Sequence, residues 1–137
     1  MHNLFDLELA IADIEAADDL IKTDGLPTQK NVFDPGDHNG RFIGDLPGGA
    51  TILGRGSVVV DGSISGSKSN PCRILVKGDL VVTGDIEHAQ IRCRQFFCRG
   101  NLQHAQLKTQ NDAIISGQIT DSELVLGDYL ERKHQIE

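Results

Sequence analysis

Apolar and polar positions change their period near Leu46. Beyond it, short apolar triplets alternate with glycine, as in GSVVVDGSIS (56–65) and GDLVVTGDIEHAQIRCR (78–94). The cadence continues in QFFCRGNLQHAQLKTQ (95–110) and NDAIISGQITDSELVLG (111–127). Short runs rich in Val, Ile and Gly favour strands and tight corners over helices. The second half of the chain is therefore predicted to be all-β and internally repeated.

One glycine anchors each repeat, and the spacing between successive anchors is 22, 16 and 17 residues. The first spacing is longer because it contains SKSNP (67–71), which we interpret as an insertion at a corner of the coil. Apolar columns recur at fixed offsets from each anchor. The anchors are Gly62, Gly84, Gly100 and Gly117, and the columns are Val58/Leu80/Phe96/Ala113, Val60/Val82/Cys98/Ile115, Ile64/Ile86/Leu102/Ile119, Ala89/Ala105/Ser122 and Ile91/Leu107/Leu124.

A unit of 16 or 17 residues is too short for a helical repeat, so each unit is predicted to be a coil of short strands. Coils of this kind cannot bury an apolar side alone and must stack on one another. The sequence predicts a right-handed parallel β-helix of about five coils over residues 46–128, the handedness following the usual crossover preference. Residues 129–137 are expected to be a tail or a short capping helix.

Residues 1–24 predict an acidic amphipathic α-helix, with Asn3 as a capping residue. Its apolar positions recur at a spacing of three or four residues. Residues 25–45 are rich in Gly, Pro, Asp and Asn and are interpreted as a linker. The apolar positions of the predicted helix are Leu4, Leu7, Ile11, Ile14 and Ile21.

One apolar column does not fit a solvated exterior. Strand alternation points Val59, Val81, Phe97 and Ile114 outward, and a stacked apolar strip of that size is seldom left bare. We expect either the N-terminal helix or a second subunit to cover it. These four residues and the apolar face of the helix are therefore the predicted interface.

The net charge of −7 is concentrated at one end of the chain. Residues 1–24 carry seven acids and one base, a net charge of −6, while the remaining 113 residues carry 13 acids and 12 bases. Nucleic acid and anionic membranes are not expected as partners, because both reward basic surfaces. No apolar run predicts a membrane span and no signal peptide is seen, so a cytoplasmic location is expected.

The tandem units quoted above resemble the β-helical repeat of the bacterial flagellar assembly protein A (FapA) family, over about residues 50–127. Bactofilins, which form cytoskeletal polymers, and the C-terminal domain of the division inhibitor MinC are similar at this level. The resemblance implies a non-catalytic scaffold or assembly protein that self-associates or binds a protein partner. It supplies no catalytic residue and no cofactor.

Candidate chemistry is confined to a few side chains. His88 and His104 fall in one column with Asp121, and this column is interpreted as a solvated polar ladder in preference to a metal ladder. Cys72, Cys93 and Cys98 lack metal-site spacing and are interpreted as buried thiols. No metal site is predicted. Two alternatives stay open: a bactofilin-like polymer, and a ligand- or metal-binding enzyme.

Overall fold

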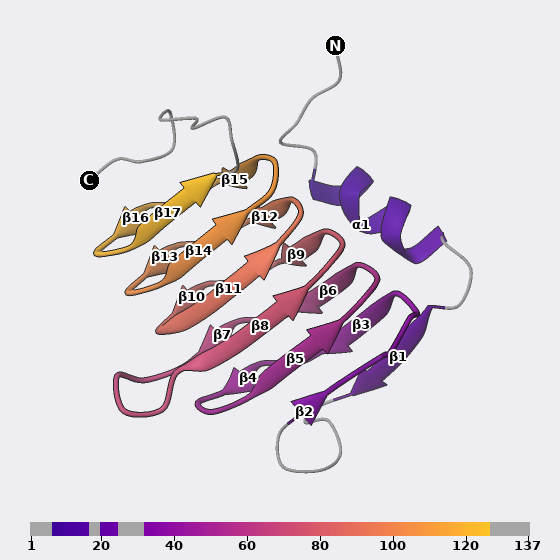
Figure 1. The fold of residues 1–137 in the computed structure, drawn as a ribbon, viewed down its shortest axis with the longest axis horizontal. Coiled ribbons are helices and arrows are strands. Elements are labelled where there is room, and N and C mark those ends of the chain that lie inside the picture. Colours follow the sequence, from indigo (N-terminus) through magenta and orange to yellow (C-terminus); the bar gives the residue numbers. More distant parts are fainter. Residues whose placement is uncertain (1–6, 17–19, 25–31, 127–137) are drawn as a thin grey trace.

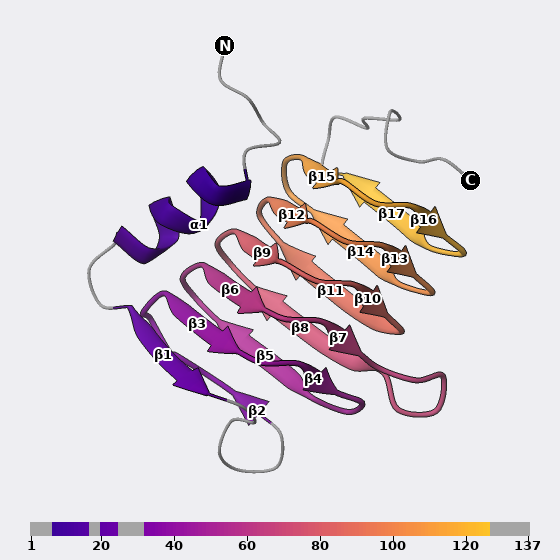
Figure 2. The same ribbon diagram turned by 180° about the vertical axis from the view of Figure 1, so that it is seen from behind.

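The computed structural model describes residues 7–16, 20–24 and 32–126. Over these residues the chain winds into a parallel β-solenoid with one short helix on its outside (Figures 1 and 2). The predicted fold class is confirmed. Six strands stack in the longest sheets, so the solenoid has about six turns rather than the expected five.

Three parallel sheets form the sides of the solenoid, and we name them A, B and C. Sheet A contains β1 (Ile21–Asp24), β3 (Gly40–Ile43), β6 (Val58–Asp61), β9 (Leu80–Val82), β12 (Phe96–Cys98) and β15 (Ala113–Ile115). Sheet B contains β2 (Val32–Phe33), β5 (Thr51–Gly54), β8 (Cys72–Val76), β11 (Ala89–Cys93), β14 (Gln106–Thr109) and β17 (Glu123–Leu126). Sheet C contains β4 (Leu46–Pro47), β7 (Ile64–Ser65), β10 (Ile86–Glu87), β13 (Leu102–Gln103) and β16 (Ile119–Thr120).

Each turn crosses sheet A, then sheet C, then sheet B, and returns to sheet A one level further along the axis (Figure 1). The sense of winding is right-handed, as the crossover preference predicts. Stacking is in register, so Val60, Val82, Cys98 and Ile115 form one column inside the solenoid. Their neighbours across the interior come from sheets B and C, and together they form one continuous apolar core.

The N-terminal boundaries differ from the prediction. Helix α1 is confined to Leu7–Ala16, and Ile21–Asp24 is strand β1 rather than helix. The predicted linker also contains strands β2 and β3, so the solenoid starts before Leu46. Phe33 on β2 and Phe42 on β3 pack edge to face inside the first turns, with their ring centroids 5.8 Å apart, and contribute to the core there. These strands were not predicted because the Gly and Pro residues at the corners are typical of a linker. Residues 25–31 and the predicted tail 129–137 lie outside the described residues.

The anchor glycines sit where successive coils approach most closely. A Cβ atom on Gly84 would lie 2.8 Å from the carbonyl oxygen of Gly62, and one on Gly100 would lie 2.6 Å from that of Gly84. These separations are too short for a side chain, which explains the glycine at this corner. The backbone N–H of Gly84 uses the space instead and donates to the Gly62 carbonyl at 2.9 Å.

Polar side chains hold the same corner from the position after each anchor glycine. The Asp45 carboxylate accepts from the Ser63 backbone N–H at 2.9 Å, and the Asp85 carboxylate accepts from that of Asn101 at 2.9 Å. The Asn101 amide oxygen accepts from the Gln118 backbone N–H at 2.9 Å. This ladder satisfies backbone donors that a corner would otherwise leave unpaired.

The extra residues in the first long repeat form an exposed loop, as predicted. Ser67 and Asn70 exchange backbone hydrogen bonds of 3.2 and 3.1 Å across it. The Asn70 carbonyl also accepts from the Gly49 N–H of the preceding turn. The insertion therefore leaves the register of the coils on either side intact.

Candidate functional site

Helix α1 covers the outward apolar strip of sheet A. The helix contacts β6, β9 and β12, and Ile14 packs against Val59 and Val81. Both valines are completely buried and Ile14 is 6% exposed. Phe97 is partly buried at the edge of this cluster. From the sequence we expect either the N-terminal helix or a second subunit to cover this strip, and in the structure the helix covers it.

The remaining predicted interface residues do not all join this seam. Ile114 is 6% exposed, and Ile11 is partly buried against the cluster. Ile21 was expected on the helix but lies on strand β1, where it is 38% exposed. Leu7 begins α1 but its side chain lies outside the described residues, as does Leu4 altogether.

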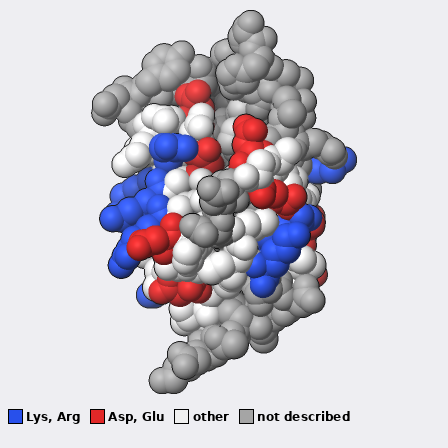
Figure 3. Space-filling view, turned by 90° about the vertical axis from the view of Figure 1, so that its right-hand side faces the viewer, with Lys and Arg blue, Asp and Glu red and all other residues white. Residues whose placement is uncertain are grey.

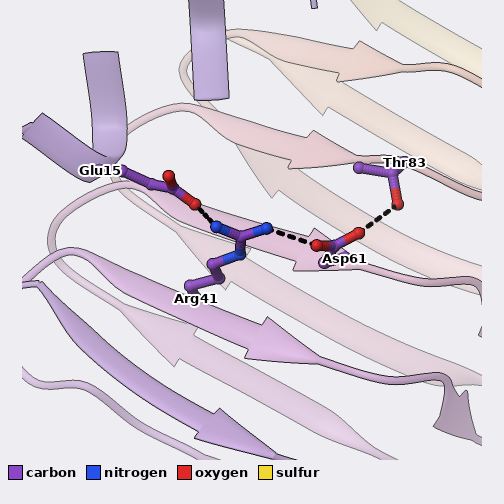
Figure 4. A network of polar contacts seen from close by, with 4 residues as sticks. All are labelled: Glu15, Arg41, Asp61 and Thr83. Carbon is purple, nitrogen blue, oxygen red and sulfur yellow. Dashed lines mark hydrogen bonds and ion pairs between the residues drawn. The ribbon is translucent and has the colours of Figure 1, made fainter. Parts of the chain in front are cut away.

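A polar network fixes the end of the helix to the sheet (Figure 4). Arg41 on β3 forms ion pairs with Glu15 on α1 and with Asp61 on β6, the latter at 2.5 Å. The Thr83 hydroxyl donates to the other Asp61 oxygen at 3.2 Å. The hydrogen bond from Arg41 lowers the pKa of Asp61, with Thr83 adding to the effect. Sequence patterning missed this network, because its members lie on separate turns.

The histidine column forms a stack at the corner between sheets C and B. The rings of His88 and His104 lie 4.6 Å apart and almost parallel, at an interplanar angle of 10°. Asp121 follows in the column, with its carboxylate 4.0 Å from His104 Nδ1. Among residues 7–16, 20–24 and 32–126, no three His, Cys, Asp or Glu side chains gather in a geometry that could hold a metal ion.

All three cysteines are buried and unpaired, as predicted. Burial raises the pKa of Cys98 to about 12 and raises the pKa of Cys93 even further. The pKa of Cys72 is also raised by burial, and its Sγ donates to the Pro47 carbonyl at 3.1 Å. These thiols fill the core rather than offer a nucleophile.

A group of positive charges lies on the outer face of sheet B. Arg92 stacks directly over Lys108, and Leu75 of the preceding turn is in register with Arg92. Arg73 and Lys77 lie on that preceding turn, two residues before and two residues after Leu75. All four side chains are exposed, and none has an acidic partner among the described residues. We call these four residues the basic face. Figure 3 shows Lys and Arg gathered along its left-hand edge, on the sheet B side.

The basic face borders two shallow hollows in the surface. One, of about 530 Å³, is lined by Leu53, Leu75 and Lys77 among others, and the next, of about 760 Å³, by Arg92, Lys108 and Gln110 among others. Lys77 and Arg92 line both hollows, so the two lie side by side. Leu75 is 47% exposed beside these bases. The surface can therefore offer an anionic partner both charge and a small apolar contact.

Two neighbouring arginines are already neutralised. Arg55 pairs with Asp37 at 2.6 Å and Arg94 with Asp79 at 3.0 Å. The guanidinium of Arg55 holds the pKa of Asp37 below its usual value. The basic face is unpaired by contrast, so an external anion would form the most favourable charge interactions there.

Within the part of the chain that the structure describes, no helix has the length and apolar character needed to cross a membrane. Comparisons with protein-family models, with curated proteins and with solved structures found no match.

Proposed function

We propose that this protein is a non-catalytic assembly module that associates with further copies of itself through the outer surfaces of its solenoid. The observation that carries the proposal is the basic face, four exposed and unpaired cations on three consecutive turns, of which Arg92 and Lys108 are in register. Like charges held at strand spacing, about 4.8 Å, repel one another and are relieved when an acidic surface covers them. The resemblance to the flagellar assembly protein A family points to the same kind of role.

The fold suits such a role because three parallel sheets stack columns of side chains along its axis. A single core runs through the turns, and side chains alternate between that core and the exterior. Partners can therefore be recognised by columns of side chains at fixed spacing. We place the protein in the cytoplasm of a bacterium, where its unpaired thiols would stay reduced.

The test is the solution mass of the full chain, measured by light scattering on a sizing column over a hundredfold range of loading concentration. Self-association predicts a mass above that of the 14.9 kDa monomer that grows with concentration. The mass should fall as NaCl is raised, because charge pairs at a surface are screened. A monomer at every concentration and at low salt would contradict the proposal.

A second candidate is a bactofilin-like polymer that grows end to end. The observation that favours it is strand β1, which pairs only with β3 among the described strands. The Ile21 N–H donates toward β3, so the N–H of Lys22 points to the open edge. Open parallel edges are templates for a further strand.

Negative-stain microscopy separates the two candidates. End-to-end growth predicts unbranched filaments, which a Lys22→Pro variant should shorten or abolish because it removes the outward donor and spares the β1–β3 bonds. Filaments that form equally well with Lys22→Pro would argue against growth through this edge.

A further inference from the structure

We propose that the basic face of one copy binds the outer surface of helix α1 on a second copy, side by side along the solenoid axis. The inference rests on the proposed self-association and names the two surfaces that meet. Its first support is position. Helix α1 contacts β6, β9 and β12, while the basic face lies on β8, β11 and β14 with Lys77 just after β8.

These two sets of strands belong to the same three turns. The strands β6 and β8, β9 and β11, and β12 and β14 are each joined within one turn. The helix and the basic face therefore stand at one level along the axis, on different sides of the molecule (Figures 1 and 2). Two copies related by a sideways shift alone bring the surfaces together.

The two surfaces also agree in length. A ten-residue helix is about 15 Å long at 1.5 Å per residue. Three turns stacked at strand spacing span about 10 Å between the outer two strands, plus the reach of their side chains. The helix can therefore touch cations on all three turns at once.

Charge selects the second copy as the occupant. Residues 1–24 hold seven acids and one base, the densest acidic stretch of a chain with a net charge of −7. Within it, Asp13 is exposed on α1, whereas Glu15 is already paired with Arg41. The acidic segment of another copy is attracted to the basic face, and residues 25–137, which contain that face, are close to neutral with 13 acids and 12 bases.

The outer surface of the helix is shaped for close approach. Ala12 and Ala16 are exposed beside Asp13, so small side chains flank the acid. Leu75, 47% exposed on sheet B, can then contact the helix between the bases. Because the two surfaces differ, the contact is heterologous, and repetition of the same shift gives an open row of solenoids.

The test is charge-reversal complementation with the full chain. Arg92→Glu/Lys108→Glu reverses the basic face, and Asp13→Lys/Ala16→Lys reverses the helix surface without touching Glu15 or the buried seam. The matched control for the basic-face variant, Lys68→Glu/Arg99→Glu, also replaces two cations by two acids, at exposed positions off sheet B. Circular dichroism and the thermal midpoint verify that each variant is folded.

We expect each reversed variant to associate at least about tenfold more weakly than wild type at low salt. The control should associate as wild type does. An equimolar mixture of the two reversed variants should recover wild-type association, since each then meets an opposite charge. The measured quantity is the weight-average mass against concentration.

The outcomes separate this inference from the proposed function. A wild type that is always monomeric overturns both. A wild type that associates while Arg92→Glu/Lys108→Glu behaves identically overturns only the basic face as the contact. Failure of the mixture to recover association overturns α1 as the occupant. Wild-type binding to phosphatidylserine vesicles or to a single-stranded oligonucleotide that is lost in Arg92→Glu/Lys108→Glu, with self-association unchanged, overturns the second copy in favour of that anion.

Discussion

The imidazole rings of His88 and His104 stack 4.6 Å apart at a corner where both residues have left-handed backbone conformations. Their φ angles are each 52°, and Asp121 continues the column with a φ of 48°. Left-handed residues other than glycine are uncommon and favour His, Asn and Asp. The column that looked like a metal ladder in the sequence is therefore, first of all, a set of turns that demands these residue types.

The corner makes a prediction about residue type at position 104. His104→Val should lower the free energy of unfolding by about 1–2 kcal/mol, because a β-branched residue is strained at positive φ. His104→Gly, which tolerates that conformation, should be less costly in spite of the lost stacking. Gln106→Val is the control, since valine suits an exposed strand position. Urea unfolding measures all three, and equal stability of the Val and Gly variants would contradict the argument.

The seam under α1 makes a prediction about local opening. Ile14→Ala removes the helix side chain that packs on Val59 and Val81. A helix of ten residues is not stable alone, so the variant should release α1 while the solenoid core stays folded. Amide hydrogen exchange should show α1 losing protection by about tenfold or more, with β9 changed much less.

The control for the seam is Ala12→Gly, which weakens the same helix from its exposed side. It should lower helix protection by about the cost of one glycine, about 1 kcal/mol. A loss of protection in β9 as large as that in α1 would show instead that helix and solenoid unfold as one unit.

The Arg41–Asp61 pair makes a prediction about pH. The pKa of Asp61 lies below its ordinary value of 3.8 when folded, because the guanidinium of Arg41 and the hydroxyl of Thr83 favour the carboxylate. A lowered folded pKa means that the contribution to stability is complete above 3.8 and is lost as pH falls through the folded pKa.

Asp61→Asn should therefore be less stable than wild type by a constant amount near neutral pH. This difference in stability between Asp61→Asn and wild type should become smaller only below the ordinary pKa that the Asp61 carboxyl has in the unfolded chain. Asp112→Asn is the control, because Asp112 has no ion pair among the described residues. Urea unfolding midpoints of the three proteins, measured from pH 7 into the acid range, test this prediction. If the stability of Asp61→Asn and that of wild type became equal above pH 5, the lowered pKa of Asp61 would be contradicted.

Much of the solenoid could be predicted from residues alone, because its strands repeat. Columns such as Val60, Val82 and Cys98 share an offset from glycine, and stacking in register follows once that offset is seen. The covered strip was predictable for the same reason, since Val59 and Val81 break the alternation between core and solvent.

The first turns escaped prediction because their anchors differ. Gly44 takes the place of the anchor glycine in this part of the solenoid and has a φ of 121°. Phe33 and Phe42 occupy core positions at which the following turns have smaller residues. The helix was extended too far because Ile21 continues a spacing of three or four that ends, in the structure, at Ala16. The basic face was not predicted as a surface, because charge was counted along the chain, whereas its four cations come together only across turns.

The buried thiols give the last prediction. Only the thiolate reacts with a disulfide reagent, and burial raises the pKa of Cys98 to about 12 and that of Cys93 further. At pH 8 the folded protein should therefore react with an aromatic disulfide reagent only as fast as it opens. Denaturant should make all three thiols react within the mixing time, each with an ordinary pKa.

Single replacements assign the signal to its source. Cys72→Ala and Cys98→Ala should each remove one equivalent of thiol in denaturant and leave the folded protein unreactive. If the helix seam and the solenoid open separately, Ile14→Ala should not accelerate labelling, because all three sulfurs lie in the core of the solenoid rather than under α1. Fast labelling of a thiol in folded wild type would mean that the solenoid wall opens at that turn. Loss of the fast reaction in Cys72→Ala or Cys98→Ala would identify that cysteine, and a fast reaction that persists in both variants would identify Cys93.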